Sequence, residues 1–251
     1  MRGSPPHVDR EGTGVRKLVV SLVLISVLIF ALNYEEFYEE FVSYRDTHNV
    51  EGMKNLIERL EAAQDKDYKI LTLLADAYVE YGLWGAKESE KESVFEKARK
   101  YAEEAIKLKH DYAYAYYVRG SAIGRLAQYK GLLKSLFMVD DFDYSMKKAM
   151  ELDPKCFRAM IGMGMRYRDL PWPFRNYKKS EEYFLKALKV EPRYVNTYLE
   201  LGILYKVWGK KEKAIEMFKK VLELPPMKGF TALGMEAKET AKKYLKELGA
   251  L

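Results

Sequence analysis

The fold of this chain is decided by residues 195–226, which read VNTYLELGILYKVWGKKEKAIEMFKKVLELPP. With Val195 as position 1, small and large apolar residues stand at fixed offsets over two helix-length segments. They are Tyr198, Leu201, Gly202 and Tyr205 at positions 4, 7, 8 and 11, then Ala214, Phe218, Val221 and Pro226 at positions 20, 24, 27 and 32. Glycine and alanine allow two antiparallel helices to cross closely, the large side chains fill the space between them, and proline ends the second helix. The pattern predicts a helical hairpin that needs neighbours to bury its apolar face.

Three earlier stretches carry the same pattern with extra residues inserted. The repeat that begins at Phe157 has its second helix four residues late, after Pro171-Trp172-Pro173. The repeats that begin at Ala113 and Tyr68 have their second helices ten and eleven residues late. The sequence therefore predicts four helical hairpins with long inter-helix insertions, near residues 68–108, 113–154, 157–192 and 195–226.

The flanking segments extend this array at both ends. Residues 34–64 show apolar residues at helical spacing and predict two amphipathic helices broken near residues 47–49. Residues 235–249 place Lys and Glu on most outward positions, as a capping helix does. Strand signals are nearly absent, and 48% hydrophobic residues suffice for a large core. We predict an all-α helical solenoid over residues 34–251, closed by a C-terminal capping helix.

The N-terminal residues 1–33 form a separate leader. Residues 18–32 are an uncharged apolar run preceded by Arg16 and Lys17, which is the pattern of an export segment. The run is short for a membrane span, for which about twenty residues are typical. Its cleavage site is poor, since Ile29 is too large two positions before Ala31. An uncleaved membrane anchor and a cleaved signal peptide both stay open, and either predicts an extracytoplasmic location, in a periplasm or on the outer face of the cytoplasmic membrane.

The first fourteen residues are rich in Pro and Gly and have no apolar pattern. Val15-Arg16-Lys17 would make a compact start of an export segment. We hypothesise that the natural chain starts at Val15, read as Met. A peptide recovered from residues 1–14 of natively expressed protein would contradict this.

The charges and reactive residues indicate neither nucleic-acid binding nor catalysis. The net charge is +6, but Lys and Glu are intermixed along the helices, which is typical of solvated faces and not of a basic stripe. The three histidines lack metal-ligand spacing, and the single Cys156 has no neighbouring His to suggest nucleophilic work. We therefore expect no enzymatic activity, no metal and no cofactor.

The hairpins are identified as tetratricopeptide repeats. Their layout is carried by the insertion at residues 124–131, the helix at residues 143–154 and the Pro171-Trp172-Pro173 connection. Over about residues 65–250 this layout is similar to the T-component lipoprotein associated with TRAP transporters and to the regulator of microtubule dynamics family. The resemblance implies a helical solenoid, an extracytoplasmic protein in the first family, homo-oligomer formation, and binding of a hydrophobic ligand or of a transporter's substrate-binding component. The lipoprotein cysteine of the T-component is missing here.

In tetratricopeptide domains the first helix of each repeat lines the concave side, mainly through positions 2, 5, 9 and 12. In the later repeats this face is apolar in the middle with cations at its edges, which predicts a groove for an amphipathic anion. The candidate ligand-binding residues are Tyr114, Tyr117, Arg158, Ile161, Met165, Arg168, Asn196, Leu199, Ile203 and Lys206. Two functions follow: an extracytoplasmic, membrane-associated scaffold that binds a protein partner, or a carrier or reservoir for a small amphipathic ligand such as a fatty acid. A scaffold leaves the groove open, whereas a carrier needs the insertions to close it into a pocket of several hundred cubic ångströms, a typical size for a small-molecule site.

Overall fold

The computed structural model describes residues 34–251, apart from the side chains of residues 132 and 133. The chain divides into two compact units, Met1–Glu40 and Phe41–Leu251. Within the first, the described residues 34–40 are helical. No helix among the described residues is long and apolar enough to cross a membrane. The predicted export segment, residues 18–32, lies outside the described residues.

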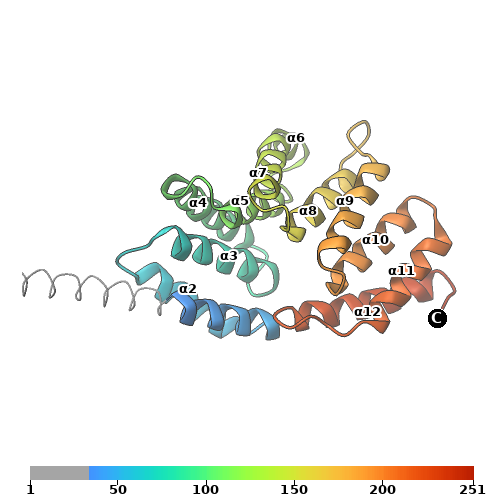
Figure 1. Ribbon diagram of the computed structural model, residues 1–251, viewed down its shortest axis with the longest axis horizontal. Helices are drawn as coiled ribbons and strands as arrows, with labels where there is room; N and C mark the ends of the chain where they lie inside the picture. Colours follow the sequence, from blue (N-terminus) through green and yellow to red (C-terminus); the bar gives the residue numbers. More distant parts are fainter. Residues whose placement is uncertain (1–33) are drawn as a thin grey trace, which may run out of the picture. The chain divides into compact units, whose positions relative to one another are not determined.

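The second unit consists of helices throughout the part that the structure describes, which confirms the predicted all-α fold. Helix pairs α3/α4, α5/α7, α8/α9 and α10/α11 form the four hairpins, and each packs on the next (Figure 1). A helical segment at residues 41–47 precedes them. The bounds are α2 Val50–Ala62, α3 Tyr68–Trp84, α4 Lys91–Leu108, α5 Ala113–Leu126, α6 Leu132–Phe137, α7 Val139–Leu152, α8 Phe157–Asp169, α9 Tyr177–Val190, α10 Val195–Val207, α11 Lys211–Glu223 and α12 Thr231–Glu247.

The glycine at position 8 of a repeat sets the contact between its two helices. A Cβ atom added to Gly202 on α10 would stand 2.4 Å from the ring of Phe218 on α11. Gly164 on α8 has the same relation to Phe184 on α9, with a distance of 2.6 Å. Both rings are fully buried. The register read from the sequence is therefore correct in these repeats, because only glycine lets the two helices approach this closely.

The extra residues of the earlier repeats take two forms. In the second repeat they build an additional short helix, α6, between α5 and α7. In the first repeat most of them lengthen the helices themselves, since α3 and α4 have 17 and 18 residues where α10 and α11 have 13 each. The loop of the first repeat, residues 85–90, stays short because the added residues 81–84 are mostly apolar and continue the α3 helix.

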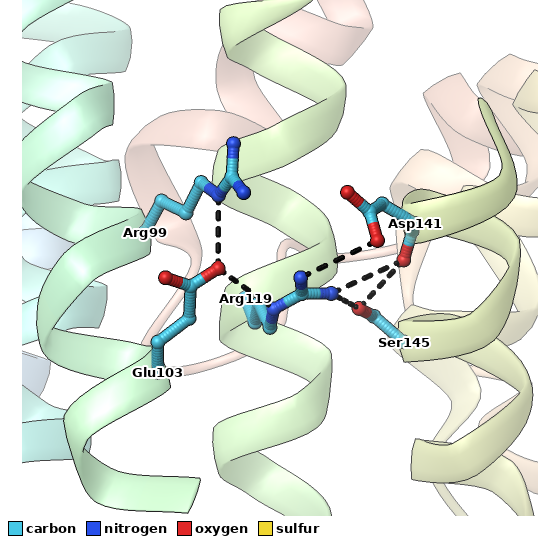
Figure 2. Close-up of polar contacts among 5 residues, drawn as sticks. All are labelled: Arg99, Glu103, Arg119, Asp141 and Ser145. Atoms are coloured by element: carbon cyan, nitrogen blue, oxygen red, sulfur yellow. Dashed lines mark hydrogen bonds and ion pairs between the residues drawn. The ribbon is translucent and has the colours of Figure 1, made fainter. Parts of the chain in front are cut away.

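A polar network joins α4, α5 and α7 next to the α6 insertion (Figure 2). Arg119 on α5 donates from Nε to Glu103 Oε1 at 3.1 Å and from Nη1 to Ser145 Oγ at 2.6 Å. Arg99 Nε donates to the same carboxylate oxygen of Glu103 at 2.9 Å. The Arg119 side chain is only 13% exposed, so these bonds hold three helices together in partly buried surroundings.

The two ends of the second unit meet. Arg45 donates from Nε to the carbonyl oxygen of Gly229 at 2.9 Å, and Asp46 Oδ1 accepts from the backbone N–H of Thr231 at 2.7 Å. In Figure 1 the end of the N-terminal helical segment lies beside the start of α12. A simple open solenoid has no such contact, so these bonds close the array of hairpins upon itself.

Candidate functional site

A cavity of about 670 Å³ lies on the inner side of the hairpins. Most of its lining is apolar and comes from α3, α5, α7 and α8, including Val79, Ile123, Phe142, Ile161 and Met165. The insertion of the second repeat contributes Ser135, Met138 and Val139 to the wall. This volume lies within the range of about 300–1,000 Å³ that small-molecule sites occupy.

Arg158 on α8 crosses the inner side to the carboxylates of α3. Its guanidinium nitrogens lie 3.2 Å from Glu80 Oε1 and 3.6 Å from Asp76 Oδ2. The hydroxyl of Tyr114 donates a short hydrogen bond to Asp76 Oδ2. Burial, reinforced by the neighbouring Asp76, raises the pKa of Glu80 above its usual value. We name Asp76, Glu80, Tyr114 and Arg158 the inner cluster.

The segments that close the unit cover this inner cluster. The ring of Phe230 is close to two guanidinium groups: its centre lies 4.0 Å from that of Arg45 and 5.4 Å from that of Arg158. Arg158 also lies 4.5 Å above the ring of Tyr117, and Tyr194 meets Phe230 edge to face. Stacking of arginine on aromatic rings is stronger when water is excluded, so closure of the unit and the inner cluster support each other.

His48 and Trp84 lie on the cavity wall near this closure. Their rings stack with centroids 4.8 Å apart, and His48 Nδ1 lies 3.1 Å from Glu236 Oε1 on α12. His48 has a positive φ of 51°, which a tight break between two helices requires. This break lies where the sequence predicts an interruption, near residues 47–49.

Arg125 on α5 is a cation of the cavity wall that could bind an anionic group of a ligand. It forms no ion pair or hydrogen bond with its side chain among the residues whose side chains the structure describes. Ser121 and Gln128 lie one turn before and after it on the same side and also line the cavity. The cavity therefore combines apolar walls with a cation and neutral donors.

The structure brings half of the predicted ligand-binding residues to the cavity: Tyr117, Arg158, Ile161, Met165 and Asn196. The other half lies elsewhere. Tyr114 belongs to the inner cluster, Leu199 is buried in the core and Ile203 packs against it. Arg168 forms ion pairs with Asp169 and Glu200, and Lys206 with Glu247. The ligand-binding role of all ten residues stays a prediction, but the structure shows that each of the three predicted cations already has an acidic neighbour.

Several cavity residues were missed from the sequence, and the reason differs among them. Met138 and Phe142 follow the insertion, where repeat positions cannot be counted. Arg45 and His48 precede the first repeat and reach the cavity through closure of the unit. Arg125 directly follows Gly124, the last groove-facing position of the second repeat. A charged residue next to a glycine on that face could have indicated from the sequence that Arg125 reaches the cavity.

A second hollow of about 480 Å³ lies between α4, α5 and the α6 region. Its lining is mainly charged, with Glu96, Arg99, Lys100 and Glu103 on α4 and Lys130 and Lys134 opposite. Lys130 bridges Glu92 and Glu96 at 2.5 and 2.6 Å. Arg99 also pairs with Glu103, so the hollow contains ion pairs, and those of Lys130 fasten the insertion to α4.

Comparison with protein families matches two models to this chain. The model described as regulator of microtubule dynamics protein 1-3 matches residues 37–167, more than half of the chain. A tetratricopeptide repeat model matches residues 195–226, the stretch from which the register was read. No curated protein matches the sequence.

A solved structure shows the same fold. The chain is similar to TTC0263, a thermophilic tetratricopeptide repeat protein from Thermus thermophilus, with 18% identity and a TM-score of 0.67 over 84% of this chain and 98% of that one. A MamA structure (MSR-1) aligns at 17% identity over 84% of this chain and 99% of that one, with a TM-score of 0.46. Tetratricopeptide domains are generally non-enzymatic scaffolds for protein partners, and this chain has the tetratricopeptide scaffold. Because this family model matches residues 37–167, more than half of its length, the chain belongs to the regulator of microtubule dynamics protein 1-3 family.

Proposed function

We propose that the cavity holds one small amphipathic molecule, for which a long-chain fatty acid is the simplest model, and that the protein is a carrier or reservoir for it. The observation that carries this proposal is the cavity of about 670 Å³, walled on one side by the insertion residues Ser135, Met138 and Val139. A groove for an extended protein segment would not need this wall. The apolar lining suits a hydrocarbon chain, whose burial contributes about 0.8 kcal/mol per CH₂ group.

The acid group of such a ligand is assigned to Arg125. Arg158 is held by Asp76 and Glu80, so a ligand would have to displace two carboxylates to reach it. Arg125 has no such competitor among the described side chains, and Ser121 and Gln128 supply further donors beside it. A charge-assisted hydrogen bond from the arginine fork is worth about 1.5–3 kcal/mol.

Calorimetry with a long-chain carboxylate tests this function. The parent is expected to bind it saturably, and Arg125→Gln is expected to weaken binding by about 10- to 100-fold, the equivalent of one charge-assisted bond. Arg193→Gln is the matched control, because Arg193 is exposed, pairs among the described residues only with Glu191, and does not line the cavity. Ser121→Phe should also weaken binding because it fills part of the cavity.

Two results would count against the proposal. Absence of saturable binding by the parent at high micromolar ligand would refute the carrier function. An unchanged affinity in Arg125→Gln, with a loss in Ser121→Phe, would keep the cavity as the site and refute the assignment of the acid group.

A second candidate is a protein partner that inserts apolar side chains into the same cavity. The exposed Leu83, which lines the cavity, favours it, because a partner segment would cover a leucine that the fold leaves in water. A substrate-binding component of a transporter is the partner that the sequence suggests. Cross-linking from a photoreactive residue at position 83 to a purified candidate component tests this, and labelling that a long-chain carboxylate does not compete away would separate the two functions.

The protein is further proposed to act outside the cytoplasm, at a membrane. Support for this comes from the basic residues Arg16 and Lys17 followed by the apolar residues 18–32. Protease added to intact spheroplasts should digest the domain if it faces outward. Protection of the domain until the membrane is permeabilised would contradict an extracytoplasmic location.

A further inference from the structure

The connection between α8 and α9 projects aromatic side chains into water. Residues 171–176 are all exposed, and Trp172 is 82% exposed. Phe174 beside it and Leu185 on α9 are also exposed. Isolated exposed apolar residues are common on proteins, but a tryptophan and a phenylalanine two residues apart form a prominent apolar tip.

The backbone holds this tip in one place. The N–H of Phe174 donates to the carbonyl oxygen of Pro171 at 2.9 Å, and the N–H of Asn176 donates to that of Tyr167 at 2.8 Å. Asn176 then caps α9 by accepting from the N–H of Lys179 at 3.0 Å. The aromatic tip is therefore tied to the ends of both helices, and little ordering entropy remains to be lost when it binds something.

Basic residues surround the tip and continue along the outer side of α9. They are Arg175, Lys178, Lys179, Lys186 and Lys189, all exposed, against one exposed acid, Glu182. None of the five forms an ion pair among the residues described by the structure. Three lie 5.2–5.4 Å from tyrosine rings, which are neutral, so no carboxylate offsets their charge there.

We propose that this outer surface, residues 171–176 with the exposed side of α9, docks onto an anionic lipid bilayer. Tryptophan prefers the membrane–water interface, and basic side chains flanking it are attracted by anionic headgroups. A bound peptide commonly lays its side chains into a groove. Neither cavity described above includes a residue of this surface, whereas a bilayer receives a projecting tip without one. The proposal depends neither on the cavity nor on its ligand.

Tryptophan fluorescence of the full chain in vesicles tests the docking. The vesicles are phosphatidylcholine with brominated acyl chains, with and without roughly a third of phosphatidylglycerol, a content that gives an anionic surface. In the anionic vesicles the bromine atoms should quench a component of the emission that Trp172→Phe removes. Trp84 and Trp208, both partly buried, remain as an internal reference.

Charge variants distinguish docking of the surface from anchoring by residues 18–32. Each basic residue near an anionic surface changes partitioning by about fivefold, so the triple variant Arg175→Gln/Lys178→Gln/Lys189→Gln should weaken docking on the order of a hundredfold. The matched control Lys211→Gln/Lys219→Gln/Lys243→Gln removes the same charge from exposed positions on α11 and α12 and should keep the quenching.

Three outcomes would overturn the proposal. The first is that the emission removed by Trp172→Phe is not quenched in anionic vesicles. The second is equal quenching in neutral vesicles or in the α9 triple variant, which would mean that the anchor alone brings the tip to the bilayer. The third is a change of the Trp172 emission with a soluble acidic peptide and none with vesicles, which would make this surface a protein-docking site.

Discussion

Replacing Gly202 by alanine tests the packing of the hairpins directly. The added Cβ atom would lie 2.4, 2.6 and 3.0 Å from three ring atoms of Phe218, where ordinary contacts are 3.4–4 Å. The ring would have to move by about 1 Å in a close-packed interior. It has little freedom to do so, because it is fully buried and its other neighbour, the ring of Tyr244, stacks on it at 5.1 Å.

Two effects of opposite sign determine how much Gly202→Ala changes the free energy of unfolding. Overpacking of this kind costs about 1–3 kcal/mol. Alanine in place of glycine inside a helix stabilises by about 1 kcal/mol. We expect Gly202→Ala to lower the free energy of unfolding by about 0–2 kcal/mol, a balance of these two terms. In a Phe218→Leu background the clash is relieved and the helix effect remains, so the same substitution should stabilise, and the coupling between the two positions should be about 1–3 kcal/mol.

The assay is equilibrium urea unfolding of the full chain followed by circular dichroism and by tryptophan fluorescence. Agreement of the two probes checks that the transition is cooperative, and constant slopes allow the free energies to be compared. Gly162→Ala on α8 is the control, because the nearest atom to its added Cβ is the flexible end of Met146 at 3.2 Å. If Gly202→Ala has the same effect in both backgrounds, the close contact between positions 8 and 24 does not control stability and the argument fails.

Four further outcomes are expected. Gly209→Ala should destabilise by about 1–2 kcal/mol in the same urea assay, since Gly209 has a φ of 78° with open space around it and the cost comes from the backbone alone. Arg158→Ala should lower the free energy of unfolding by about 3–5 kcal/mol, because it leaves the buried carboxylates of the inner cluster without their cation. A decrease below about 1 kcal/mol, measured by thermal unfolding, would show that the inner cluster does not stabilise the fold. Burial raises the pKa of Glu61, but the hydrogen bonds donated by Tyr78 and Tyr101 outweigh burial and hold that pKa below 4.5. The stability that this carboxylate contributes is therefore present above pH 4.5 and is lost as the pH falls through the lowered pKa. The melting temperature of Glu61→Gln should decline less than that of the parent over this acid range. Residues 34–251 should fold without the leader, and a circular dichroism spectrum with substantial strand content, or an insoluble product, would contradict this.

The sequence by itself determined the hairpins and their register. The residues that pair within a hairpin are close in the chain, and their contact recurs at a fixed offset, so Gly202 and Phe218 could be matched by counting. The same counting put Ile161 and Met165 on one side of α8, and both line the cavity, whereas it put Leu199 and Ile203 on the same side of α10, where they belong to the core. The break near residue 48 and the capping role of the last helix were equally local signals.

Only the tertiary structure decided how the inner side is used. Arg158 reads as a ligand-binding cation in its own repeat, yet it binds Glu80, which is 78 residues away. Arg45 meets Gly229 across 184 residues. Such pairs depend on the small rotations between successive hairpins, which add up along the array and which no single repeat encodes. The insertion has the same effect, because its residues have no repeat position until α6 and α7 fold against the neighbouring hairpins. The complete cavity wall therefore emerges only when all four hairpins are in place, since each contributes too little of the surface to reveal it alone.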